Sequence, residues 1–281
     1  FVADSFIKGK NFVGGIIGYD GYETRDCHIF DCNVTSQKSD VTIIGSECVG
    51  GIVGCGICQN SHASVDVLGS SSVGGLIGST GSSRTKTEKI SASSFSGSVS
   101  GESAVGGIVG LSRANITSCK ATAEIYVETG YAGGICGRYE RNEYYDHGIY
   151  IAGCYADGTI VPSSGSTVAM GGITTSEHYF DAALVYHSYS TVMCSSANFD
   201  GIGICADDRN GNYKAYDCCA VTDTKVEGSN NQSFCTDITT FMKDCYSEYA
   251  GLWNFNNTWT WKGTINGKEV SVSCPRLAWE Q

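Results

Sequence analysis

A six-residue phrase, Val-Gly-Gly-Ile-Val-Gly, recurs along this chain and limits its fold more than any other feature. The intact phrase and its copies occupy residues 13–18, 49–54, 73–78, 105–110, 132–137, 170–174 and 201–206, the last three being looser. The first glycines of the six clear copies are 36, 24, 32, 27 and 38 residues apart. A unit of this length that repeats so often is typical of a solenoid. In a solenoid each turn packs only against its neighbours, so no central core is needed.

A second repeated phrase alternates with the first in strict order. It ends in cysteine or serine, and a mostly large residue and then a small or aliphatic one follow. The nine copies end at Ser5, Cys32, Ser61, Ser94, Cys119, Cys154, Ser188, Cys218 and Cys245. Because successive strand residues face opposite sides, we expect the cysteine or serine inside the turn, the next residue outside and the third inside. In the Ser94 copy, this assignment places Phe95 outside and Ser96 inside.

The internal column accounts for most of the 15 cysteines. An odd number cannot all pair as disulfides, and the chain is far longer than small disulfide-dependent domains. Free cysteine behaves as a small, buried hydrophobic residue, so we predict a ladder of free thiols. Cys55 and Cys58 have the two-residue gap of a zinc knuckle, but no second pair lies at a matching distance. We therefore predict no metal and no cofactor.

The two repeated phrases also predict where each turn bends and where it varies. Glycine allows close backbone approach or a positive φ, so we expect each Gly-Gly pair to form a tight edge between two faces of the turn. Length varies between turns because of insertions, which in a solenoid become loops on one edge. The insertions span residues 19–27, 79–89, 138–150, 174–186 and 207–216.

The last part of the chain differs from the rest. All four tryptophans lie beyond residue 250, and Ile265-Asn-Gly-Lys268 carries the Asn-Gly signal of a tight hairpin. A solenoid has to cover its last open turn with an atypical unit. We therefore expect residues 1–250 to form the repeat array and residues 251–281 to form a tryptophan-rich C-terminal cap.

The repeats resemble the GLUG motif of bacterial proteins, which reads Asn-Cys-Tyr-x-Thr-Gly-x-Val and then Val-Gly-Gly-Leu-Val-Gly. The similar segments run from Asn33 to Gly54, from Val73 to Gly78 and from Cys154 to Ile160. The end of the chain is similar to the Trp…Pro-x-Leu-x-Trp close of such arrays, here Trp259, Pro275, Leu277 and Trp279.

The resemblance implies an all-β fold, a single-stranded, right-handed parallel β-helix of eight to nine turns with a C-terminal cap. It also implies a secreted or surface-anchored bacterial protein. Some members of the family are adhesin-like, and some arrays flank the peptidase domain of surface IgA-cleaving metallopeptidases. The repeat itself brings no known catalytic residues.

Composition and motifs exclude several classes of function. The formal charge of −11 argues against nucleic acid, which requires a basic face, and no run approaches the about 18 apolar residues of a membrane span. His-Glu-x-x-His, Gly-x-Ser-x-Gly and the phosphate-binding Gly-x-x-x-x-Gly-Lys-Ser/Thr are all absent. The sequence begins at Phe1, as expected for a mature product or a piece of a longer chain.

The insertions hold the remaining chemical signal, because aromatic rings beside carboxylates suit a sugar ring. The candidate binding residues are Tyr139, Glu143, Tyr144, Tyr145, Asp146, His147, Glu177, His178, Tyr179, Asp181, Asp207 and Asp208. We expect a non-catalytic module for adhesion or spacing, which binds a host or matrix glycan or glycoprotein and adjoins other domains of a larger surface protein.

Three alternatives to this binding edge remain. The loops can be plain solvated segments. A polysaccharide-active enzyme can use paired carboxylates, and Glu143, Asp146, Glu177 and Asp181 are the candidates. Calcium can be bound by oxygen ligands, which Asp20, Glu23 and Asp26, or Asp207 with Asp208, could supply.

Overall fold

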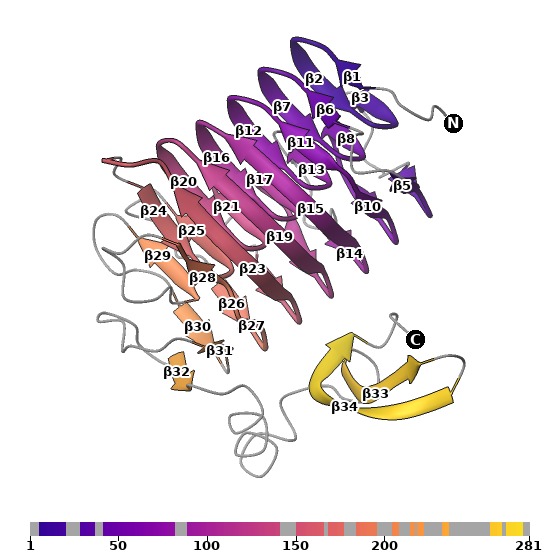
Figure 1. Ribbon diagram of the computed structural model, residues 1–281, viewed down its shortest axis with the longest axis vertical. Coiled ribbons are helices and arrows are strands. Elements are labelled where there is room, and N and C mark those ends of the chain that lie inside the picture. Colours follow the sequence, from indigo (N-terminus) through magenta and orange to yellow (C-terminus); the bar gives the residue numbers. More distant parts are fainter. Residues whose placement is uncertain are drawn as a thin grey trace.

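The computed structural model shows a column of stacked β-coils that runs from β1 and β2, near the N-terminus, to β31 and β32 (Figure 1). The all-β, parallel β-helical fold expected from the sequence is confirmed. The structure describes residues 6–20, 29–36, 42–81, 89–140, 150–165, 168–176, 184–195, 204–207, 214–216, 218–221, 232–235, 259–265 and 268–277.

Each turn of the column passes through four sheets, here named D, A, B and C in chain order. Sheet A contains β1 (Ile7–Lys8), β5 (Asn33–Thr35), β6 (Thr42–Ile44), β10 (His62–Ser64), β11 (Asp66–Leu68), β15 (Ser94–Gly101), β19 (Lys120–Val127), β23 (Tyr155–Pro162), β27 (Tyr189–Ser190), β28 (Met193–Cys194), β31 (Cys218–Val221) and β32 (Gln232–Cys235). Sheet B contains β2 (Asn11–Gly14), β7 (Glu47–Gly50), β12 (Ser71–Gly74), β16 (Ser103–Gly106), β20 (Gly130–Gly133) and β24 (Val168–Gly171).

The other two sheets are built in the same way. Sheet C contains β3 (Ile17–Tyr19), β8 (Val53–Cys55), β13 (Ile77–Ser79), β17 (Val109–Ser112), β21 (Cys136–Tyr139), β25 (Thr174–Ser176) and β29 (Cys205–Asp207). Sheet D contains β4 (Ile29–Phe30), β9 (Cys58–Gln59), β14 (Lys89–Ser91), β18 (Asn115–Thr117), β22 (Tyr150–Ala152), β26 (Leu184–Tyr186) and β30 (Lys214–Tyr216). Along sheet A the strands follow in the order β1-β6-β11-β15-β19-β23-β27-β31-β32, and those from β1 to β31 come one from each successive turn.

Aliphatic residues stack like above like inside the coil. One such column in sheet A contains Ile43, Val67, Val99, Ile125 and Ile160, which pair in parallel register and are each at most 1% exposed. Burying a side chain of this size stabilises a fold by about 1.5–3 kcal/mol. The column explains why the array needs no separate core, because each turn is covered by the next.

The Gly-Gly pairs lie at the corner between sheets B and C. Gly106 ends β16 in register with Gly133 of the next turn, and β17 begins three residues later. A Cβ atom on Gly107 would lie 2.2 Å from the carbonyl oxygen of Gly134 and 2.7 Å from Cβ of Ala121. No side chain fits there, so the predicted tight edge is confirmed.

The cysteine and serine ladder lies at the corner between sheets D and A. Ser61, Cys119, Cys154 and Ser188 are fully buried, as predicted. All cysteines with described side chains are free thiols, among them Cys32 of the same column. The predicted ladder of free thiols is therefore confirmed for these positions, and Cys245 lies outside the described residues.

Ladder side chains make hydrogen bonds that the sequence did not predict. The hydroxyl of Ser61 donates to the carbonyl of Gln59 at 2.8 Å, and the thiol of Cys154 donates to that of Ala152 at 3.4 Å. Ser188 repeats the same contact with the carbonyl of Tyr186 at 2.8 Å. A ladder residue must therefore be small and able to donate, which explains why cysteine and serine replace one another.

One assignment of inner and outer residues was wrong. Ser93, not Ser94, belongs to the ladder, because Ser94 pairs with His62. Consequently Phe95 points inward and is 1% exposed, while Ser96 is exposed. The interior of the coil has room for the Phe95 ring because Gly75 lies opposite it. A Cβ atom on Gly75 would lie only 2.3 Å from Cγ of Phe95.

A column of left-handed residues precedes the ladder. The residue before each ladder position has a positive φ, and these values are 54° at Asp31, 46° at Asn60, 49° at Ala92, 52° at Ser118, 60° at Gly153 and 45° at His187. Asparagine, aspartate and glycine tolerate this conformation better than most residues. The turn from sheet D into sheet A is therefore the same tight bend in successive coils.

Beyond the column, β33 (Trp259–Ile265) and β34 (Lys268–Leu277) form an antiparallel pair, drawn in yellow in Figure 1. Ile265 pairs with Lys268, so the hairpin predicted from the Asn-Gly signal is confirmed. The role of residues 251–281 as a cap, and the boundary at residue 250, stay predictions.

Candidate functional site

The edge between sheets C and D is where the turns differ most. Two described turns cross it with only two residues, 56–57 and 113–114. Five others cross it with longer segments, which span residues 20–28, 80–88, 140–149, 177–183 and 208–213. Because the strands on both sides stack in parallel register, all these segments leave and rejoin the column along one edge. We call it the loop edge, and it confirms the expectation that the insertions share one edge.

Four of the five loops are shorter than the insertions predicted from the sequence, and the first, residues 20–28, is shifted by one residue from its predicted position. Strand β21 includes Arg138 and Tyr139, and β25 includes residues 174–176. On the returning side, residues 184–186 and 214–216 belong to β26 and β30. Pairing with the neighbouring turn makes these ends part of the column, as where Cys136 pairs with Thr174.

The structure describes only two of the predicted binding residues. Tyr139 is 2% exposed, so its assignment to the projecting surface is corrected, and its ring packs within the column. Asp207 ends β29 opposite Ser176. The others lie outside the described residues, and they are Glu143, Tyr144, Tyr145, Asp146, His147, Glu177, His178, Tyr179, Asp181 and Asp208.

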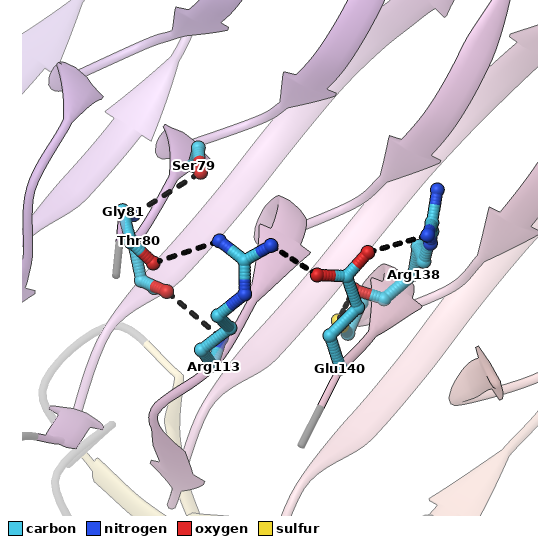
Figure 2. Close-up of polar contacts among 7 residues, drawn as sticks. Ser79, Thr80, Gly81, Arg113, Arg138 and Glu140 are labelled. Carbon is cyan, nitrogen blue, oxygen red and sulfur yellow. Dashed lines mark hydrogen bonds and ion pairs between the residues drawn. The ribbon is translucent and has the colours of Figure 1, made fainter. Parts of the chain in front are cut away.

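Three charged side chains form a network at the base of the loop edge. Figure 2 shows the carboxylate of Glu140 between the guanidinium groups of Arg113 and Arg138, and both contacts are ion pairs. Arg113 also donates through its backbone N–H to Oγ1 of Thr80 at 2.8 Å and through its guanidinium to the carbonyl of Gly81 at 3.3 Å. The network joins three consecutive turns at the points where two long loops leave the column.

The network is half-buried, with side-chain exposures of 13% for Glu140, 30% for Arg113 and 26% for Arg138. Arg138 also lies over the ring of Tyr131, 5.4 Å from its centre. The two oxygens of the Glu140 carboxylate are each paired with a guanidinium group. Glu140 is therefore suited to hold the bases of the loops in place.

Aromatic residues lie where the chain returns from the loop edge into sheet D. Tyr150, the first residue of β22, is 38% exposed and meets Tyr186 of the next turn edge to face, with ring centres 6.3 Å apart. The backbone N–H of Tyr150 donates to Oδ1 of Asn115 at 2.9 Å. Sequence analysis placed Tyr150 and Tyr186 only at the ends of insertions. Their signal was the recurrence of tyrosine in sheet D strands, at the start of β22 and at the ends of β26 and β30, where Tyr216 is in register with Tyr186.

The cysteines beside the loop edge are protonated thiols. Burial raises the pKa of Cys55 to about 12, with smaller contributions from Cys48 and Asp20, and burial likewise raises the pKa of Cys48. A thiol with a raised pKa is a poor nucleophile and a poor metal ligand at neutral pH. Within the described part of the chain, no three histidine, cysteine, aspartate or glutamate side chains gather as metal ligands would. Glu23 and Asp26 of the calcium alternative lie outside it.

The described residues contain no helix that is long and apolar enough to cross a membrane. Sequence comparison with curated proteins found no match. A solved chain from Bacteroides ovatus, described as "a putative immunoglobulin A1 protease", is similar at 16% identity, with a TM-score of 0.45 over 99% of this chain and 76% of that chain.

Residues 101–126 match the family model of the GLUG motif. This segment is one complete turn, because Gly101 pairs with Val127 in the next turn. It contains the corner at Gly106 and the ladder residue Cys119. The motif is a repeat module and not a catalytic family. The GLUG motif of residues 101–126 thus forms one complete turn of a parallel β-helix.

Proposed function

We propose that this chain is a non-catalytic extracellular module of a bacterial surface protein, which serves adhesion or spacing. Its ligand is a host or matrix glycan or glycoprotein, bound through the loop edge. The observation that carries the proposal is the collection of five long connections on one edge of an otherwise regular column.

The arrangement supports contact with a large ligand. Stacked turns repeat at about 4.8 Å, so loops from neighbouring turns are close enough to contact one partner together. Several weak contacts on one rigid support raise the overall affinity without any strong individual site. The ion pairs of Glu140 with Arg113 and Arg138 add rigidity at the base of the edge.

The aromatic pair suggests which ligand chemistry the edge accepts. The exposed ring of Tyr150 beside the amide of Asn115 offers an apolar face next to a polar group. A sugar ring presents the same combination of C–H faces and hydroxyl groups. We therefore favour a glycan, or the glycan of a glycoprotein, over a purely protein ligand.

A binding screen tests the proposal. The wild-type chain is applied to a glycan array and to immobilised host-matrix glycoproteins, and Tyr150→Ala is compared with Tyr126→Ala. These tyrosines are 38% and 40% exposed on different faces, so they form a matched pair. We expect at least one glycan or glycoprotein whose binding falls at least tenfold in Tyr150→Ala and is unchanged in Tyr126→Ala. If the folded wild-type chain binds none of these surfaces, the adhesive function is excluded and the role of a spacer remains.

The same preparation tests the catalytic alternative. Polysaccharide turnover by the wild-type chain would contradict the proposal, provided that the activity falls when Glu143, Asp146, Glu177 or Asp181 is replaced singly by its amide. Full activity in all four variants would instead indicate a contaminating enzyme.

A further inference from the structure

The outer face of sheet A carries a regular array of polar and aromatic side chains, and sheet D separates this face from the loop edge along each turn. Three successive turns contribute outward residues from β10 and β11, from β15 and from β19. They form three columns, which are Ser64, Ser96 and Thr122; Asp66, Ser98 and Glu124; and Leu68, Ser100 and Tyr126. We call these nine residues the hydroxyl lattice.

The strand geometry fixes the spacing of the lattice. Neighbouring turns are about 4.8 Å apart, and alternate residues on one strand are about 6.6 Å apart. The middle turn presents only serines, while the turns on either side carry the larger Leu68 and Tyr126. These two side chains are 43% and 40% exposed. The lattice thus presents two exposed apolar surfaces separated by a row of hydroxyl groups.

Hydrogen bonds hold the polar groups in fixed directions. Oδ1 of Asp66 accepts from the hydroxyl and the backbone N–H of Ser98, at 2.7 and 3.2 Å. The phenol of Tyr126 donates to Oε2 of Glu124 at 3.0 Å, and the hydroxyl of Ser96 donates to that of Ser64 at 3.1 Å. Groups that are already oriented lose less conformational entropy when they bind a ligand.

We infer that the hydroxyl lattice binds a polysaccharide chain that carries no acidic groups, laid across the turns. Such a chain alternates hydroxyl donors and acceptors, as the lattice does, and its ring C–H faces can stack on Tyr126. Aromatic rings supply large contact area at low entropic cost. The serine row leaves space for a sugar ring between Leu68 and Tyr126, two turns apart.

Charge complementarity selects against acidic partners. Asp66 and Glu124 give the lattice negative charge, and the whole chain carries −11. A hydrogen bond to Glu124, with a further charge effect of that residue, raises the pKa of Tyr126 and keeps the phenol a neutral donor. Nucleic acids, sulfated glycans and uronic-acid polymers would meet repulsion. A basic peptide would be attracted, but salt would screen that attraction strongly.

The inference does not depend on the loop edge. The lattice lies within residues 62–68, 94–101 and 120–127, and none of the five long connections belongs to these strands. Loss of the loops would therefore remove the proposed adhesive site and leave the lattice. The matched tyrosines, Tyr126 in the lattice and Tyr150 at the loop edge, separate the two sites.

Affinity electrophoresis and calorimetry of the full chain test the inference. The probes are a soluble β-glucan, a xylan and a galactomannan, with pectin, heparin and a polylysine peptide as charged comparisons. We expect at least one neutral polysaccharide to bind, with a Kd that changes less than about twofold between low and high salt. Tyr126→Ala should weaken binding about tenfold or more. Glu124→Gln should also weaken it, and Tyr150→Ala should leave it unchanged.

Several results would overturn the inference. These are no binding to any neutral probe, binding to the charged probes alone, or loss of neutral-polysaccharide binding in Tyr150→Ala but not in Tyr126→Ala. Thermal unfolding of each variant shows whether the fold is intact. If Tyr126→Ala fails to fold, Glu124→Gln decides, because an amide keeps the size of the side chain, and unchanged affinity in that variant would count against the lattice.

Discussion

The backbone N–H of Cys119 donates to Sγ of Cys154 in the next turn, 3.4 Å away. The N–H of Cys154 in turn donates to Oγ of Ser188, one turn further on, at 3.1 Å. Four ladder residues thus accept a hydrogen bond from the backbone of the preceding turn and donate one to a carbonyl of their own turn, and they are Ser61, Ser93, Cys154 and Ser188. The ladder satisfies buried backbone groups at a corner where strand pairing is interrupted.

This relationship predicts different outcomes for two small substitutions. Cys154→Ser keeps a donor and an acceptor and reproduces the chemistry of Ser61 and Ser188, so we expect a change within about 1 kcal/mol. Cys154→Ala leaves the buried N–H of Cys119 without its acceptor and should lower the free energy of unfolding by about 1–3 kcal/mol. Urea unfolding measures both. Equal stability of the two variants would show that the position requires only small size.

A second prediction concerns high pH. Burial raises the pKa of Cys136 from 9.0 to about 12. Between these values the folded protein binds more protons than the unfolded chain, so stability falls as pH rises. The thiol contributes its full stabilisation below pH 9 and loses about 1.4 kcal/mol per pH unit above it. We expect the difference in unfolding free energy between wild type and Cys136→Ser to shrink from pH 9 to 10.5. If the unfolding free energies of the two proteins kept a constant difference across this pH range, the raised pKa of Cys136 would be contradicted.

A third prediction tests the corner between sheets B and C. In Gly107→Val the new side chain would overlap the carbonyl of Gly134 and Cβ of Ala121. We expect destabilisation of about 3 kcal/mol through overpacking. As a control, Thr122→Val replaces an exposed side chain on a strand by one of nearly the same shape. It should change stability by less than about 0.5 kcal/mol. An unchanged melting temperature in Gly107→Val would exclude the close contact.

A fourth prediction has the opposite sign. Ala92 has a φ of 49°, a conformation that costs an L-residue about 1–2 kcal/mol, whereas glycine adopts it freely. After subtracting the greater entropy of glycine in the unfolded chain, we expect Ala92→Gly to stabilise the protein by about 0.5 kcal/mol. Ala121→Gly, at a buried strand position outside the left-handed region, should destabilise it. Destabilisation in both variants would argue against the left-handed bend.

Much of the scaffold could be predicted from the sequence because the two repeated phrases mark the corners of each turn. The Gly-Gly pairs marked the turn from sheet B to sheet C, and they stack in register as expected. Among the described copies, the assignment of inner and outer positions was wrong at Ser93 and Ser94, where two adjacent serines fit the pattern equally well. The choice depended on Gly75 in the neighbouring turn, which admits Phe95, and such a long-range contact is not visible in the local pattern.

Less of the candidate site could be predicted from the sequence. The position of the loops followed from unequal repeat lengths, but their boundaries did not. Tyr139 looks like a loop residue in sequence and is buried because β21 extends by pairing with β17 and β25. The ion pairs of Glu140 connect residues 27 and two positions away in sequence, so only the stacking of turns brings Arg113 to it.

The central claim is that the column carries stability while the loop edge carries the proposed adhesive function. The most direct measurement replaces residues 140–149 by the two-residue Arg113-Ala114 connection that the preceding turn already uses. Binding to a ligand whose affinity falls in Tyr150→Ala in the glycan and matrix screen is then measured beside urea unfolding. The account predicts that ligand binding falls at least tenfold while the chain stays folded. Undiminished binding by this folded variant would contradict it.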